Sequence, residues 1–137
     1  MVEHLQGKRI MYIEDDTNNR ELVQTALTPH GVVMEFDQWA FPDVALTKIY
    51  RFKPDLILLD LMFPTWFTGF DVYDRMESHP LIGDIPVVIV SASDPTQSMA
   101  QARKRGMHGY MTKPINVMIF PQQISDILDG KQIWLDH

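Results

Sequence analysis

Hydrophobic and polar positions along the chain alternate in a way that predicts strands and helices in regular succession. Five short segments are almost continuously apolar, which is typical of strands that are buried on both faces of a parallel sheet. These segments lie at about 9–14, 32–36, 56–59, 85–90 and 108–112. The chain is therefore expected to be an α/β domain.

Between these segments the apolar residues recur at helical spacing, and the flanking residues are those that begin and end helices. Asp16 or Thr17 can cap the first helix, and Pro42 opens the second. Asp94 followed by Pro95 marks the start of the fourth. The expected helices cover about 17–30, 42–53, 70–77, 95–105 and 117–129. Such βα units predict a parallel sheet with helices packed against it.

Acidic side chains stand where two of the predicted strands end. Residues 14–16 are all acidic and stand at the end of the first strand, and Asp60 closes the third. Because ligand sites in open α/β sheets lie outside the carboxyl ends of the strands, these carboxylates are expected at one rim. Crowded carboxylates repel one another unless a divalent cation intervenes, and Mg²⁺ is usually held by one or two carboxylates with waters and phosphate oxygens. The pattern therefore indicates a magnesium site.

Two further polar residues suggest what the cation would help to bind. Ser91 follows the fourth predicted strand, and Lys113 follows the fifth. Their hydroxyl and ammonium groups would supply the hydrogen-bond donor and the counter-charge that a phosphoryl group bonded to Asp60 requires. The chemistry indicated by this set is phosphoryl transfer to an aspartate.

The order and spacing of four motifs extend the argument, since each motif alone is weak. Taken singly, Asp60 reads as a turn former and Lys113 as a surface residue. Together, the motifs resemble those of the receiver (CheY-like) domain of bacterial two-component response regulators, over nearly the whole chain. They lie at 11–16, 54–64, 90–92 and 110–114.

The resemblance implies a fold, a cofactor and a switch. The fold is a flavodoxin-like, doubly wound, five-stranded parallel sheet of order 2-1-3-4-5 with five helices, an order taken from the family. Asp60 would be the phosphoacceptor, and Ser91 and Lys113 would contact the phosphoryl oxygens. Ser91 and Tyr110 would act as the switch residues. The implied ligands of Mg²⁺ are Glu14, Asp15, Asp60 and the backbone carbonyl of Met62.

Three features depart from the commonest pattern of that family. Glu14 stands where many members have Asp, which keeps the charge and lengthens the reach, so its binding role is expected to survive. The turn from Thr65 to Thr68 is one residue longer than usual and is aromatic, so an altered rim is expected. Met62 and Ser93 occupy positions that, in the family, influence how fast water attacks the phosphoryl group.

Length and hydrophobic content predict one receiver domain at 1–129 and a C-terminal tail at 130–137. A single-domain response regulator that signals by protein contact is expected.

Apolar residues at 117–120 exceed what one helix can bury against the sheet. We therefore hypothesise an output surface that contains Met118, Ile119, Phe120 and Trp134. The alternative is that the tail folds back onto its own domain.

Net charge and hydropathy limit which partners and which cellular location are expected. The net charge of −6 argues against direct binding to DNA, because phosphate backbones attract basic surfaces. No apolar stretch approaches the ~18 residues that a membrane helix needs, so a cytoplasmic protein without membrane contact is expected. The expected partners are a sensor histidine kinase or phosphotransfer protein, followed by a downstream protein or a second copy of the chain.

Two other functional classes remain open at this point. A phosphatase of the haloacid-dehalogenase kind would share the sheet and the metal, but Met62 stands two residues beyond Asp60, where a second aspartate would be needed. An enzyme acting on external substrates is therefore not expected; the chain would only assist its own phosphorylation and dephosphorylation. The stronger alternative is a phosphorylation-independent, receiver-like docking module, which the aromatic turn makes plausible.

Overall fold

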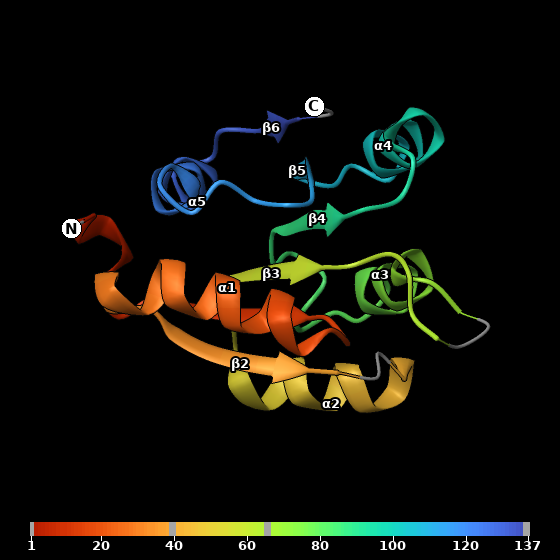
Figure 1. Cartoon of the computed structure of the whole chain (residues 1–137). Coiled ribbons are helices and arrows are strands. Elements are labelled where there is room, and N and C mark those ends of the chain that lie inside the picture. The colour runs from red at the N-terminus through yellow and green to blue at the C-terminus, as the bar shows by residue number, and fades with distance from the viewer. Residues whose placement is uncertain (1, 39–40, 65–66, 136–137) are drawn as a thin grey trace.

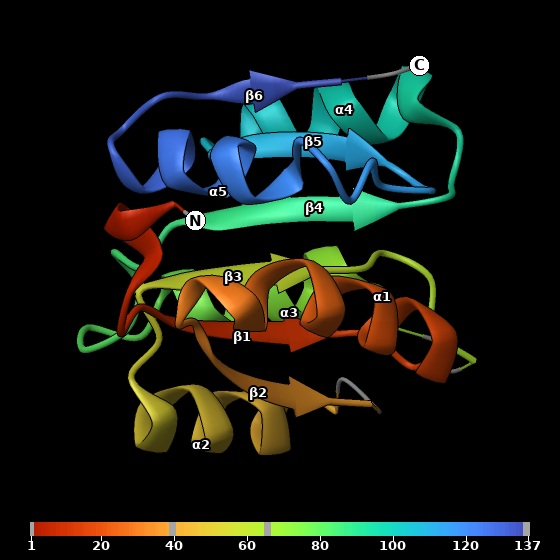
Figure 2. The same cartoon turned by 60° about the vertical axis from the view of Figure 1, so that its left-hand side comes forward.

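The computed structural model describes residues 2–38, 41–64 and 67–135, and it has a six-stranded parallel sheet at its centre. The strand order is β2-β1-β3-β4-β5-β6, and the arrows in Figure 2 all point the same way. The predicted α/β class and the order of its five strands are therefore confirmed, and a sixth strand is added. The strands are β1 (Arg9–Ile13), β2 (Val33–Asp37), β3 (Leu56–Leu59), β4 (Val87–Ser91), β5 (Gly109–Thr112) and β6 (Ile133–Trp134).

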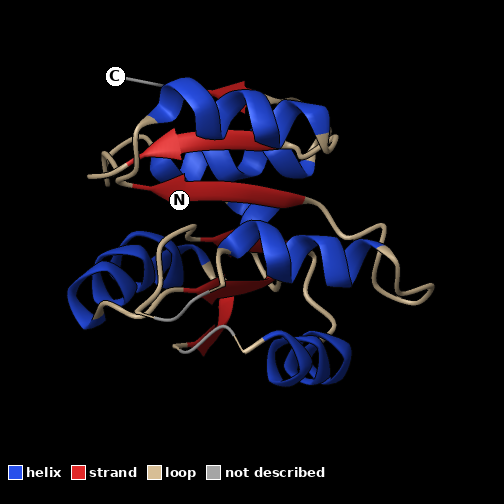
Figure 3. Cartoon of the chain, turned by 90° about the vertical axis from the view of Figure 1, so that its right-hand side faces the viewer, coloured by secondary structure: helices blue, strands red, loops and turns tan. Residues whose placement is uncertain are grey.

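Helices cover both faces of the sheet (Figure 1). Helices α1 and α5 lie against one face, and α2, α3 and α4 lie against the other, so the strands form a middle layer (Figures 2 and 3). The helices are α1 (Thr17–Leu27), α2 (Pro42–Phe52), α3 (Gly69–Glu77), α4 (Pro95–Lys104) and α5 (Phe120–Leu128), and short 3-10 turns occupy Glu3–Leu5 and Thr28–His30. None of the helices in the described ranges is long and apolar enough to cross a membrane.

The sheet is covered on both faces because the side chains of its strands alternate between two apolar clusters. In β1, Met11 and Ile13 pack with α2 and α3, whereas Ile10 and Tyr12 pack with α1 and α5. All of them are buried. This arrangement explains why the strands read as continuous apolar runs.

The helix caps lie close to the predicted positions. The side chain of Asp16 accepts hydrogen bonds from Asn18 N and Asn19 N at 2.7 and 3.2 Å, which satisfies two free amides of α1. Asp94 accepts from Thr96 N at 2.9 Å at the start of α4. These contacts fix the loops that leave the carboxyl ends of β1 and β4.

The prediction that the last helix begins near Val117 is wrong, because α5 begins at Phe120 with Pro121 in its first turn. The residues ahead of it form a turn in which Met118 is 85% exposed, whereas Phe120, the first residue of α5, is fully buried. Phe120 therefore belongs to the core and not to the predicted output surface. Apolar character alone did not separate these two neighbours.

The tail folds back onto its own domain, as in the alternative stated above. β6 runs parallel to β5, with Gly109 opposite Ile133 and Tyr110 opposite Trp134. Ile133 and Leu135 pack on the α1–α5 side of the sheet and Trp134 on the other side, as the alternation of a strand requires. The tail residues Asp136 and His137 lie outside the described residues.

Candidate functional site

Three carboxylates gather where β1 and β3 end. These two strands are direct neighbours, with Ile13 opposite Leu59, so the residues that follow them leave the sheet side by side. Ligand oxygens of Glu14, Asp15 and Asp60 lie within 4.8 Å of one another. The chain turns to opposite sides of the sheet after these strands, which is the switch point where open α/β sheets bind ligands.

Asp60 is held in place by the backbone that follows it. Its Oδ1 accepts hydrogen bonds from Leu61 N at 2.8 Å and Met62 N at 3.5 Å. The residue is almost fully buried. Because Oδ1 is bound by amides, the carboxylate has a fixed orientation, and Oδ2 faces the ammonium group of Lys113 at 3.2 Å.

Lys113 bridges two of the three carboxylates. Besides Asp60, its Nζ contacts Glu14 Oε1, and its side chain is only 13% exposed. The loop that carries it is tied to β4, since Lys113 N donates to Ser91 O at 2.9 Å. This one largely shielded ammonium thus offsets part of the negative charge at the rim.

Glu14 lies deepest in the cluster and is fully buried. Burial, followed by the neighbouring Asp60 carboxylate, raises the pKa of Glu14 to about 8, while Lys113 acts in the opposite direction. Its Oε2 has no hydrogen-bond partner among the described residues. An unsatisfied buried oxygen in a cage of carboxylates suits a hard cation such as Mg²⁺, which prefers oxygen ligands.

The backbone carbonyl of Met62, the other implied ligand, belongs to the loop that leaves Asp60. The Met62 side chain is 61% exposed and contributes no polar group. Thr65 and Trp66 of the aromatic turn lie outside the described residues. Phe67 is buried in the cluster beneath α3, and its ring meets the ring of Phe41 edge-on at 5.7 Å.

The two predicted switch residues, Ser91 and Tyr110, lie on the next strands. Ser91, at the end of β4, is fully buried, and its Oγ is 2.9 Å from Ser93 Oγ. Tyr110 in β5 is also fully buried, and its hydroxyl is 3.3 Å from the same Ser93 oxygen. The resemblance singled out Ser93 only as a position that influences water attack, and its contacts with Ser91 and Tyr110 were not predicted.

Tyr12 is a second neighbour of the site that sequence reasoning missed. Its hydroxyl is 3.5 Å from Glu14 Oε1, and burial raises its pKa. The signal for it was present, because residues two apart on a strand share a face. The buried phenol therefore remains neutral and can donate to the Glu14 carboxylate.

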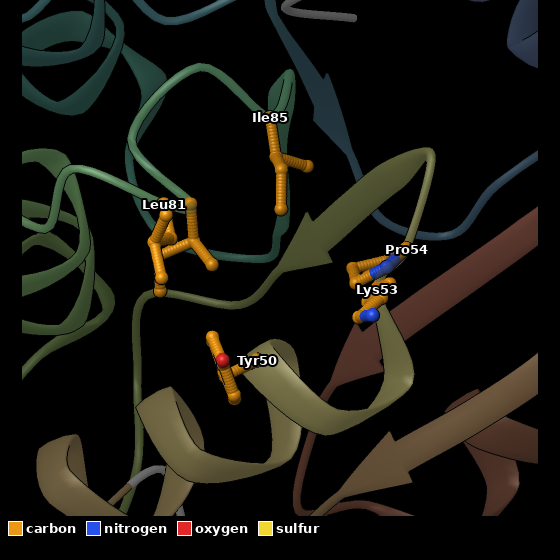
Figure 4. Close-up of a pocket in the computed structure, with 6 residues that line it drawn as sticks. Tyr50, Lys53, Pro54, Leu81 and Ile85 are labelled. Carbon is orange, nitrogen blue, oxygen red and sulfur yellow. The ribbon is translucent and has the colours of Figure 1, made fainter.

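An apolar pocket of about 400 Å³ lies at the opposite ends of the strands from the acidic cluster, where β3 and β4 begin (Figure 4). Among the described residues, its lining contains no carboxylate, so it is chemically distinct from the acidic cluster. The lining residues are Tyr50, Lys53, Pro54, Leu81, Ile82 and Ile85.

Replacing Glu14 by Gln is expected to change how stability depends on pH. A carboxyl whose pKa is raised by folding holds its proton more tightly in the folded chain, so its contribution to stability is lost as pH rises from about 4.5 to about 8. In EDTA, the free energy of unfolding in urea should therefore rise for Glu14→Gln relative to the unaltered chain, by more than about 1 kcal/mol over that pH range. Glu21→Gln, on the exposed side of α1, should run parallel to the unaltered chain. Parallel profiles for all three proteins would contradict the assignment.

Comparison with known proteins identifies the family to which this fold belongs. The family model described as the response regulator receiver domain matches residues 10–125. The chain belongs to that family. Among curated relatives of the domain, the transcriptional regulatory protein KdpE of Staphylococcus aureus is 36% identical over 112 residues, covering 80% of this chain and 45% of the relative. The response regulator PleD of Caulobacter vibrioides is 34% identical over 113 residues, covering 82% and 24%.

The receiver domain spans less than half the length of those two relatives. Solved structures agree with its fold. The chemotaxis protein CheY4 of Vibrio cholerae superimposes with a TM-score of 0.77 at 18% identity, covering 88% of this chain and 98% of that one. A CheY-like receiver domain protein of Methanospirillum hungatei gives 0.76 at 23%, covering 91% and 96%. The expected family and its doubly wound sheet are thereby confirmed.

Proposed function

We propose that this receiver domain accepts a phosphoryl group on Asp60 from a sensor histidine kinase or a phosphotransfer protein, with Mg²⁺ as its cofactor. The observation that carries the proposal is the group of three carboxylates within 4.8 Å, with the Lys113 ammonium 3.2 Å from Asp60 Oδ2. Such a site holds more negative charge than one lysine neutralises. A divalent cation would neutralise the excess negative charge and so allow the site to bind an anionic substrate.

Asp60 is the nucleophile in this mechanism. One of its carboxylate oxygens forms a bond to phosphorus while the bond from phosphorus to the imidazole nitrogen of the donor breaks, and the electron pair stays on that nitrogen. The amides that bind Oδ1 orient the carboxylate for in-line attack. The domain thus contributes positioning more than covalent chemistry.

The remaining residues of the site balance the negative charge on the transferring phosphoryl group. Glu14, Asp15, Asp60 and the Met62 carbonyl would hold Mg²⁺, which neutralises charge on the transferring oxygens when bound. Lys113 supplies a second positive charge, and the Ser91 hydroxyl donates a hydrogen bond to a phosphoryl oxygen. The same groups would assist hydrolysis of the product, so the domain acts on its own phosphoryl group and not as an enzyme on external substrates.

The signal is read by protein contact. Phosphorylation replaces the single negative charge of the Asp60 carboxylate by ~−1.5 to −2 on the phosphoryl group, which biases Ser91 and Tyr110 between two positions. The surface formed by α4, the edge strand β6 and the segment before α5 carries this change to a downstream protein or a second copy. In the segment before α5, the apolar residues Val117, Met118 and Ile119 are exposed. With a net charge of −6, direct contact with DNA is not proposed.

The proposal is tested by intact-mass measurement after incubation with acetyl phosphate and Mg²⁺. We expect one phosphoryl adduct, mapped by peptide analysis to Asp60, and none when EDTA replaces Mg²⁺. An adduct that forms equally well in EDTA would contradict the metal site. Absence of any adduct from acetyl phosphate or a phosphorylated kinase, together with absence of Mg²⁺ binding, would instead support a phosphorylation-independent docking module.

A further inference from the structure

A chain of three hydroxyl groups leads from the acidic site into β5. Ser91 Oγ and Ser93 Oγ are 2.9 Å apart, and Ser93 Oγ and the Tyr110 hydroxyl are 3.3 Å apart. Each hydroxyl has a single proton to donate and lone pairs with which to accept. In the absence of a phosphoryl group, either oxygen of each pair can be the donor, so the direction of the chain is not fixed.

The far end of this chain meets the C-terminal strand. The carbonyl of Tyr110 accepts a hydrogen bond from Leu135 N at 2.8 Å, and Tyr110 lies opposite Trp134 in the register of β5 and β6. Both aromatic side chains pack in the cluster on the α4 side of the sheet. The guanidinium of Arg103 in α4 lies 4.1 Å from the centre of the Trp134 ring. β6 is therefore attached to the switch tyrosine and to α4 together.

The close approach of β6 depends on a residue without a side chain. A Cβ atom at Gly109 would lie 2.6 Å from the backbone oxygen of Ile133. Gly109 is fixed between β4 and β6, since it also lies opposite Val88. This register brings the Leu135 amide within hydrogen-bonding distance of Tyr110.

We propose that Ser93 is a positioning residue that connects the phosphoryl site to β6, so that phosphorylation of Asp60 tightens the docking of the C-terminal strand. This inference rests on the proposed function. When the Ser91 hydroxyl donates its only proton to a phosphoryl oxygen, it must be the acceptor in its hydrogen bond with Ser93. Ser93 must in turn accept from Tyr110. All three donors then point toward the phosphoryl group, and aligned hydrogen bonds strengthen one another.

The consequence for β6 follows from the position of Tyr110. A stronger hydrogen bond at its hydroxyl holds the ring in its buried place, next to Trp134, and keeps its carbonyl in register for Leu135. Coupling of this kind is reciprocal, so a docked β6 also favours the phosphorylated state. The strand thus occupies the edge of β5 most firmly when the domain is phosphorylated.

The test uses NMR to monitor amide hydrogen exchange at Leu135. It is carried out on the full chain with Mg²⁺, with and without beryllofluoride as the phosphoryl mimic. We expect the mimic to slow exchange of Leu135 about fivefold or more in the unaltered protein. In Ser93→Ala the slowing should fall below about twofold. Ser93→Thr, which keeps a hydroxyl, should restore it, and Ser78→Ala, an exposed serine at the end of α3, should leave it unchanged.

The response within each variant is the decisive quantity, because a structural defect at position 93 would change exchange in both states alike. Equal slowing in Ser93→Ala and in the unaltered chain would overturn the proposal. So would an unchanged Leu135 in a protein whose Leu61 and Met62 amides, next to Asp60, respond to the mimic. If those two amides do not respond, the phosphorylation proposal itself has failed, and the inference fails with it.

Discussion

Replacing Asp60 by Asn will abolish the phosphoryl adduct formed with acetyl phosphate and Mg²⁺. Asparagine has nearly the same shape, and its Oδ1 can still accept from Leu61 N. Its amide nitrogen is not a nucleophile, because the lone pair is delocalised into the carbonyl group. The exchange also removes one of three crowded carboxylates. Intact mass is the measurement, and the expected result is no adduct, compared with one adduct per unaltered chain.

The matched control lies at the other end of the same strand. Asp55 directly precedes β3, and its Oδ2 accepts from Arg9 N at 2.8 Å. Asp55→Asn should keep the adduct, because it leaves the carboxyl end of β3 untouched. An adduct of equal yield on Asp60→Asn would show that another carboxylate, such as Asp15, is the acceptor. A thermal melt of each variant confirms that it is folded.

The composition of the site could be predicted from sequence for a physical reason. In a parallel sheet every strand delivers its next residue to the same rim, so linear order is enough to bring Glu14, Asp60 and Lys113 together. The apolar runs located the carboxyl ends of the strands to within about a residue. The contacts between these groups, including the unsatisfied Glu14 Oε2, depend on side-chain conformations that spacing does not determine.

The C-terminal strand could not be predicted from the pattern of residues 130–137. Ile133 and Trp134 are too few to show the alternation of a strand. Their pairing depends on the space above Gly109, a glycine that in sequence looks like any strand boundary. The same applies to Phe120, because whether an apolar residue faces the core depends on where Pro121 lets the helix begin.

Gly69→Ala will destabilise the domain by about 3 kcal/mol, because the added methyl group has no space. A Cβ at Gly69 would lie 2.2 Å from the backbone oxygen of Asp60 and 3.2 Å from Leu59 Cγ. Gly69 N also donates to Leu61 O at 3.1 Å, which closes the loop that leaves the acidic site. A backbone carbonyl cannot move aside as a flexible side chain can. The free energy of unfolding in urea is the measurement, and Mg²⁺ affinity should fall with it because the displaced atom belongs to Asp60.

Gly106→Ala separates this steric effect from the ordinary cost of replacing a glycine. Gly106 follows α4 with a φ of +76°, and a Cβ there would meet no atom of the described chain within 4 Å. Its replacement should cost about 1 kcal/mol through backbone strain alone and leave Mg²⁺ affinity unchanged. If Gly69→Ala proved no more costly than Gly106→Ala, the loop after β3 would have to yield freely. The orientation of Asp60 would then depend on its own bonds to Leu61 and Met62 and not on the close packing of α3 against the end of β3.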